Sequence, residues 1–242
     1  MSNIEYYAKL KISNGQLSHF KAQADAIVHI AKDSKSVLRC DWFINEEKGE
    51  AVAMVVHTDN AAMQLHHAAA HAHYEAIAAC CKGTLQFFGA APSPIPAALT
   101  QLNPRTLPFA YGLQATPTTI TQSYLAGGGI EIYTLIDIFA EHLDGCKAVG
   151  ADLIPIVSSK DPGTTRYDWF YDDEKLQCVA MDCYKDTPSM FAHMKNAHDV
   201  HELLFDHSTM VTEFLGELPE EAKAAVARYN PYILPLYAGL KG

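Results

Sequence analysis

The second half of the chain alternates apolar runs with short polar breaks, and this pattern predicts a series of strands and helices. Residues 130–138 are apolar and β-branched, which favours a strand. Residues 140–149 can form a helix, although Gly145 weakens it. Residues 164–171 and 176–184 alternate like two strands, and the polar turn between them predicts a hairpin.

The remaining pattern of this half adds a second helix and further strands. Thr187 and Pro188 begin a helix that runs to residue 205, with Thr187 as the N-cap and Pro188 at the first helical position. A strand at 209–215 and a short helix at 219–229 follow, and residues 232–237 form a last edge strand. The order β-α-β-β-α-β is the ferredoxin-like split βαβ plan.

The first half of the chain repeats this pattern. With an offset of 127, residues 41–113 align without a gap on 168–240 and share 25 identities in 73 positions. The identities include Trp42 with Trp169, His66 with His193 and His71 with His198. Such a register over that length predicts a tandem duplication.

The duplication sets the expected domain organisation. Residues 1–113 and 130–242 form the two repeats, and the Thr-, Pro- and Gly-rich residues 114–129 form a linker. A ferredoxin-like unit has helices on one sheet face and leaves the other face bare. The expected fold is therefore α+β, with two tandem ferredoxin-like (βαββαβ) repeats packed sheet to sheet inside one chain.

Two segments resemble a known family. KDPGTTRYDWFYDDE, residues 160–174, resembles the PGTLRYEWF signature of antibiotic biosynthesis monooxygenase-like proteins, which belong to the dimeric α+β barrel superfamily. SMFAHMKNAHDVHELL, residues 189–204, is similar to the helix that follows in that family. The resemblance spans nearly all of the second repeat and, more weakly, the first.

This resemblance implies a barrel made by two units and, in better-known members, oxidation of phenolic or quinol-like aromatics without a cofactor. Other relatives degrade haem, isomerise small metabolites or have no known reaction. The first repeat departs from the signature, since residues 35–40 (KSVLRC) stand where residues 162–167 (PGTTRY) stand in the second. The departure suggests that only the second repeat keeps a pocket.

Composition narrows the functional classes. Hydrophobic residues make up 49% of the chain and charged residues 19%, which suits a globular core. The net charge is −10, and no Lys/Arg cluster occurs, so nucleic-acid binding is not expected. The six cysteines have no CxxC spacing, the N-terminus does not read as a signal peptide, and no apolar run is long enough to span a membrane. These features predict a cytoplasmic protein with free thiols.

Histidines that recur in both repeats are the first candidates for chemistry. His193 and His198 could act as catalytic acid/base groups, and His66 and His71 as substrate-binding groups, since histidine titrates near neutrality. The alternative is a histidine packed at the helix–sheet junction. In one unbroken helix His193 and His198 would point about 140° apart, whereas a break near Asn196 would change that.

Aromatic and acidic strand residues are the second group of candidates. Trp169 and Asp168 are assigned catalytic roles, and Trp42, Tyr133 and Tyr184 substrate-binding roles. A tryptophan could stack on an aromatic ligand or belong to the core. Asp168 could orient a histidine or pair with Arg166.

The stretch LHHAAAHAHY, residues 65–74, is dense in histidine. His67 and His71 are four residues apart, the spacing of a helical metal pair. No carboxylate follows in HExxH fashion, and zinc requires further ligands. We therefore expect no metal site and no other cofactor.

Three functions stay open at the level of sequence. The first is a cofactor-independent monooxygenase-like enzyme for a small aromatic or quinol, with His193 as the base. The second is a module that binds or senses a small hydrophobic ligand, and the third is a scaffold without a ligand. A homodimer of the two-repeat chain also stays open, since the sequence does not give the oligomeric state.

Overall fold

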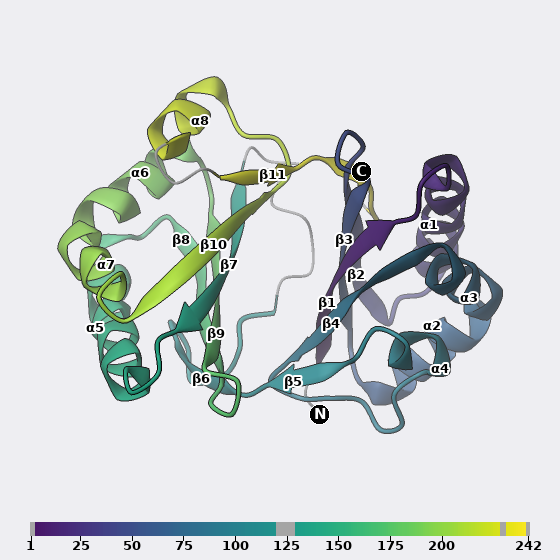
Figure 1. Ribbon diagram of the computed structural model, residues 1–242, viewed down its shortest axis with the longest axis horizontal. Coiled ribbons are helices and arrows are strands. Elements are labelled where there is room, and N and C mark those ends of the chain that lie inside the picture. Colours follow the sequence, from purple (N-terminus) through teal and green to yellow (C-terminus); the bar gives the residue numbers. More distant parts are fainter. Residues whose placement is uncertain (1–2, 120–128, 228–230, 241–242) are drawn as a thin grey trace. The chain divides into compact units, whose positions relative to one another are not determined.

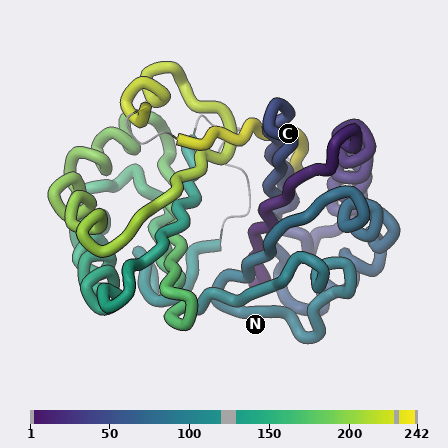
Figure 2. Tube along the Cα trace, in the orientation of Figure 1, coloured from purple at the N-terminus to yellow at the C-terminus, as the bar shows by residue number. Residues whose placement is uncertain are grey.

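The computed structural model describes residues 3–119, 129–227 and 231–240. The expected linker lies largely outside these residues. Of the described residues, none belongs to a helix long and apolar enough to cross a membrane. The predicted duplication and the α+β fold class are confirmed, since both halves contain the same order of elements (Figures 1 and 2).

The described residues of the first repeat form ten elements. They are β1 (Ile4–Ile12), α1 (Leu17–Lys32), β2 (Val37–Asn45), β3 (Glu50–His57), α2 (Asn60–Ala69), α3 (His71–Cys80), β4 (Cys81–Phe88), α4 (Ala97–Thr100), β5 (Arg105–Leu107) and β6 (Phe109–Gly112).

In the second repeat, the residues that the structure describes form the equivalent ten elements. They are β7 (Ile130–Ile138), α5 (Leu143–Lys160), β8 (Thr164–Asp172), β9 (Gln177–Tyr184), α6 (Thr187–Asn196), α7 (His198–Leu204), β10 (Ser208–Leu215), α8 (Glu220–Val226), β11 (Tyr232–Leu234) and β12 (Leu236–Ala238).

Each sheet contains one strand from the other repeat. The strand orders are β12-β2-β3-β1-β4-β5 and β11-β10-β7-β9-β8-β6. The last strand of each repeat therefore pairs with the other repeat's sheet. A single proline precedes each of these strands: Pro108 lies between β5 and β6, and Pro235 lies between β11 and β12. Contacts accordingly group residues 1–106 with the C-terminal segment from Leu234 (unit 1), and Leu107–Thr118 with the residues up to Ile233 (unit 2).

The edge strand expected at 232–237 is therefore two strands, not one. Pro235 lacks an N–H and separates β11 from β12, which belong to different sheets. The main chain still pairs there, because the amide of Ile44 on β2 donates to the carbonyl oxygen of Pro235 at 2.9 Å.

Three predicted helices differ from the structure in their limits. The short helix expected at 219–229 is α8, Glu220–Val226, with Pro219 as its N-cap. The first helix of repeat two runs from Leu143 to Lys160 instead of 140–149, because its buried face continues through Leu153 and Val157. The helix at 187–205 is broken at Ala197 into α6 and α7. Its N-cap is Asp186, whose carboxylate accepts from the Ser189 amide at 2.8 Å, and Thr187 is the first helical residue.

Helices cover one face of each sheet and form the core there. In unit 2, α5, α6 and α7 lie over the strands β7 to β10 (Figure 1). Alternate residues of the strands face these helices, among them Ile136, Trp169 and Ala180. The space between this sheet face and the helices holds the site described below.

Candidate functional site

Unit 2 contains a cavity of about 390 Å³ between its sheet and its helices. The floor consists of alternate residues of β7, β8, β9 and β10, and the roof of α6 and α7. Most of the wall is apolar and includes Ile132, Ile136, Met190 and Phe214. The volume and the few polar groups match a site for a small organic molecule.

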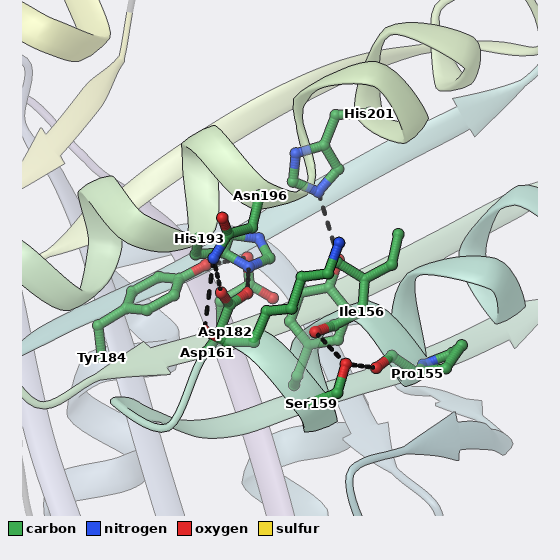
Figure 3. Close-up of polar contacts among 11 residues, drawn as sticks. Pro155, Ile156, Ser159, Asp161, Asp182, Tyr184, His193, Asn196 and His201 are labelled. Carbon is green, nitrogen blue, oxygen red and sulfur yellow. Dashed lines mark hydrogen bonds and ion pairs between the residues drawn. The ribbon is translucent and has the colours of Figure 1, made fainter.

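His193 is the central polar residue of this cavity. Its Nδ1 lies 2.9 Å from Asp161 Oδ2, and Asn196 Nδ2 donates to Asp161 Oδ1 at 2.7 Å (Figure 3). A carboxylate only accepts hydrogen bonds, so Nδ1 carries the hydrogen and donates it to Asp161. The acceptor nitrogen Nε2 is buried in the cavity and has no hydrogen-bond partner among the residues that the structure describes.

The environment of His193 favours a neutral ring. Burial lowers the pKa of His193, and the hydrogen bond and charge of Asp161 oppose this shift in part. A neutral imidazole with a free Nε2 can accept a proton, and the Asp161 carboxylate stabilises the cation that results. Asp161 lies at the C-cap of α5, in the sequence Asp161-Pro162-Gly163 that follows that helix.

A second acidic group lies on the cavity floor. Asp182 on β9 accepts a long hydrogen bond of 3.4 Å from the Tyr184 hydroxyl through Oδ2 (Figure 3). Its Oδ1 is buried and has no partner within the described part of the chain. Burial raises the pKa of Asp182 to about 7, with smaller opposing effects from Tyr184 and Arg166.

Tyr167, Trp169 and His201 also line the cavity and carry polar atoms. Tyr167 Oη and His201 Nε2 are 3.3 Å apart, and burial lowers the pKa of His201 to about 3. The ring centroids of His193 and His201 are 5.0 Å apart, and those of Tyr167 and His193 5.2 Å. Trp169 Nε1 is buried without a hydrogen-bond partner in the described residues. The cavity thus offers several unsatisfied polar atoms to a ligand.

The break between α6 and α7 brings His198 to the same cavity as His193, as the sequence left open. His198 lies at the exposed rim. Its Nδ1 is 3.2 Å from Asp199, and its Nε2 is 3.9 Å from Glu202. Because its side chain is half exposed whereas that of His193 is buried, His198 is less suited than His193 to contact a ligand inside the cavity.

The equivalent space in unit 1 is nearly filled. A cavity of about 20 Å³ remains there between Trp42, Tyr6 and Tyr74. Tyr6 Oη is 3.3 Å from both Tyr74 Oη and His67 Nε2, and the rings of His67 and Tyr74 stack with centroids 4.1 Å apart. The aligned residues of repeat two are Ile132, His201 and Met194.

Unit 1 has a cluster of buried histidines beside this small cavity. His57 Nε2 and His66 Nδ1 are 3.0 Å apart, and His67 lies beside them. Burial lowers the pKa of His57 to about 3 and of His66 to about 4, so both rings are neutral. Over residues 3–119, 129–227 and 231–240 no group of three or more His, Cys, Asp or Glu side chains could hold a metal ion. His71 is exposed on α3, away from this cluster.

Asp168 and Tyr133 lie outside the cavity. Asp168 pairs with Arg166 at 2.9 Å and accepts from the Thr118 amide at 2.7 Å. Asp41 makes the equivalent 2.7 Å pair with Arg39 in unit 1. Tyr133 alternates with the cavity residues Ile132 and Thr134, so its side chain is on the opposite sheet face. The roles predicted for these two residues stay predictions that the cavity does not support.

Of the other predicted residues, Trp169 and Tyr184 line the cavity together with His193 and His198. Trp42 and His66 belong to the core of unit 1. Sequence reasoning gave no site role to Asp161, Asp182, Asn196 or His201. A usable signal exists in the repeat itself, since the aligned residues of repeat one are Ser34, Val55, Ala69 and Tyr74. At these four positions the second repeat has an Asp, Asn or His residue that the first repeat lacks.

Comparison with known proteins gives the fold a context. No family model matches the chain, and no curated protein matches it. Among solved structures, a "putative monooxygenase" from Lactobacillus acidophilus is 12% identical with a TM-score of 0.55, and covers 88% of this chain and 92% of its own. A protein of the same description from Fusobacterium nucleatum is 13% identical with a TM-score of 0.60, over 87% and 89% of the two chains.

An anthrone oxidase-like protein is 5% identical with a TM-score of 0.52 and covers 99% of this chain and 93% of its own. The chain therefore has a monooxygenase-like fold, and the resemblance inferred from residues 160–174 is confirmed at the level of the fold. Identities this low show the fold alone.

Proposed function

We propose that the unit 2 cavity binds a small phenolic or quinol-type aromatic and promotes its oxygenation without a cofactor. His193 Nε2 accepts the proton of the substrate. The electron-rich anion then transfers electrons to O₂ and forms a carbon–oxygen bond. At a phenolic ring carbon that carries a hydrogen (a CH₂ group in the keto tautomer), the balance is one O₂ consumed, one C=O formed and one H₂O released, so the substrate supplies all the electrons.

One observation carries this proposal, the arrangement of the buried His193 imidazole in a cavity of ligand size. Its Nε2 has no hydrogen-bond partner among the described residues, and its Nδ1 is hydrogen-bonded to the Asp161 carboxylate. Asp161 fixes the tautomer that leaves Nε2 basic and stabilises the imidazolium. The protonated ring can return its proton to the oxygen that leaves as water. The monooxygenase-like fold supports the reaction class but not the substrate.

The test is oxygen uptake with a panel of anthrones and quinols. His193→Ala should lower turnover by about 10²–10⁴, because the general base is lost. His207→Ala is the matched control, since His207 belongs to the same unit but pairs with His142 outside the cavity. Unchanged turnover in the His193 variant would exclude it as the base.

Asp161→Asn tests the carboxylate behind the base. Asn196 donates to position 161, so an amide there turns its own NH₂ towards His193 and favours the wrong tautomer. We expect a loss of turnover similar to that of His193→Ala. The double variant Asp161→Asn/Asn196→Asp reverses donor and acceptor between the two positions and should regain part of the activity. Equal inactivity of both variants would argue against tautomer control.

A binding or sensing module is the second candidate, favoured by the mainly apolar wall. It predicts that aromatics bind with no oxygen consumption, and that His193→Ala changes affinity alone.

A further inference from the structure

Asp182 is an acidic residue in the cavity that the proton transfer to His193 does not use. It lies on β9 between Tyr167 of β8 and Ile132 of β7 in the sheet register. The aligned residue of the filled unit is Val55, so the carboxyl group belongs only to the unit with the open cavity.

The hydrogen bonds of Asp182 leave one oxygen available. Oδ2 accepts from Tyr184 at 3.4 Å, which is a weak bond. Oδ1 has no partner within the residues the structure describes, although it is buried and the residue lines the cavity. A buried polar atom of this kind costs free energy unless a ligand satisfies it.

Charged and titratable groups approach Asp182 from each neighbouring element. Arg166 and Asp168 influence it from β8 with opposite signs, and Tyr184 does so from β9. The remaining titratable residues of the cavity and of the His193 pair are Tyr167, Asp161, His193, Lys195, His198, His201 and Glu202. Burial outweighs these effects and raises the pKa of Asp182 to about 7, so the protonated form is well populated at neutral pH. A protonated carboxyl group has an O–H donor.

We propose that Asp182 donates a hydrogen bond from Oδ1 to a carbonyl oxygen of the ligand, so that the cavity selects hydroxylated aromatics that also carry a ketone or quinone oxygen. This proposal rests on the proposed function in one respect, the assignment of His193 as the base that removes the proton of the ligand's hydroxyl group. When His193 removes the hydroxyl proton, negative charge is delocalised towards a conjugated carbonyl oxygen. A donor already in place at that oxygen stabilises the anion without reorganisation.

The experiment measures anaerobic binding of two probes, 3-hydroxybenzophenone and 3-benzylphenol, by isothermal titration calorimetry. The probes differ only in C=O against CH₂. They are titrated against the wild-type chain, Asp182→Asn and Asp182→Val. The valine variant copies repeat one, and the asparagine variant keeps an N–H donor that does not ionise.

We expect Asp182→Val to weaken binding of the ketone about ten- to hundredfold and to change binding of 3-benzylphenol by less than about threefold. Wild-type affinity for the ketone should fall between pH 6 and 9 more than that of Asp182→Asn, because ionisation removes the donor. Because both chains are titrated with the same probe, ionisation of the probe affects both affinities equally and does not contribute to the difference between them. Infrared spectra should show a protonated carboxyl band at pH 6 that Asp182→Asn lacks.

Equal affinity of the wild-type and Asp182→Val chains for the ketone would overturn the proposal, as would failure of the wild type to bind the ketone. Because these titrations need no oxygen, their outcome is independent of turnover. Probe discrimination without oxygen uptake would refute the proposed function alone. Oxygen uptake without discrimination would refute the role of Asp182 alone.

Discussion

At the scale of single residues, the two repeats place the same buried histidine in different surroundings, although both units contain buried polar atoms without a hydrogen-bond partner among the described residues. In unit 2 the groups around His193 have unsatisfied atoms that face a cavity. In unit 1 the aligned His66 contacts another histidine, and Tyr6 and Tyr74 fill the space. One inherited position thus serves as a candidate base in one copy and as core in the other.

The buried histidines predict a dependence of stability on pH. Burial lowers the folded-state pKa of His57 to about 3, whereas its unfolded value is about 6.5. Between these values the unfolded chain binds a proton that the folded chain does not bind, so the free energy of unfolding falls as the pH falls below 6.5. The loss at pH 5 is about 2 kcal/mol for His57 alone.

His57→Tyr, which copies Tyr184, should make this decline shallower by about one proton, as measured by urea unfolding between pH 7.5 and 5. Asp182 acts with the opposite sign. Its folded pKa is raised, so its unfavourable contribution decreases as the pH falls below about 7 and is gone near the unfolded pKa of about 4. Asp182→Asn is therefore the control and should steepen the decline. An equal slope in the wild type and the His57 variant would contradict the assignment.

At the scale of elements, the exchanged strands hold each unit together. β12 pairs with β2 in the register Leu236 with Phe43, and Tyr237 Oη donates to Asp25 at 2.7 Å. Lys21 Nζ also lies 4.7 Å from the centroid of the Tyr237 ring. The last strand of the chain therefore completes the sheet of the first repeat.

Truncation after Leu234 should lower the free energy of unfolding of unit 1 by about 1–3 kcal/mol, since several hydrogen bonds of about 1 kcal/mol are lost. Hydrogen exchange at the Ile44 amide, which donates to Pro235, should become faster. Tyr237→Phe removes one exposed bond and should have a much smaller effect. Unchanged exchange at Ile44 in the truncated chain would show that β12 does not protect β2.

At the scale of the whole molecule, the unequal cavities of the two duplicated units predict one ligand per chain. Cavities of about 390 and 20 Å³ occupy equivalent positions in units 2 and 1. The difference arises largely from three substitutions between the repeats, since Tyr6, His67 and Tyr74 are larger or more rigid than Ile132, Met194 and His201.

The variant Ile132→Tyr/Met194→His/His201→Tyr writes the unit 1 residues into unit 2. It should stay folded, because the same three side chains pack together in unit 1, and it should bind aromatic probes at least about a hundredfold more weakly since the cavity is filled. Calorimetric titration of the wild type should give one site per chain. Two sites, or normal binding by the variant, would disprove the assignment of the cavity.

The sequence by itself determined the duplication, the order of strands and helices and the fold class, because the alternation of apolar residues and the register of 127 are local, one-dimensional signals. It also identified His193, Trp169 and Tyr184, which line the cavity.

Tertiary structure alone decided which side chains meet. Asp161 reaches His193 across 32 residues, and Asp182 faces the cavity because of its register on β9. Tertiary structure also decided that β6 and β12 pair with the sheet of the other repeat, because the partner of a strand depends on the direction of the backbone after Pro108 and Pro235. Strand partners, side-chain contacts and cavity volume arise from packing between segments that are distant in the sequence, so the pattern of one segment cannot predict them.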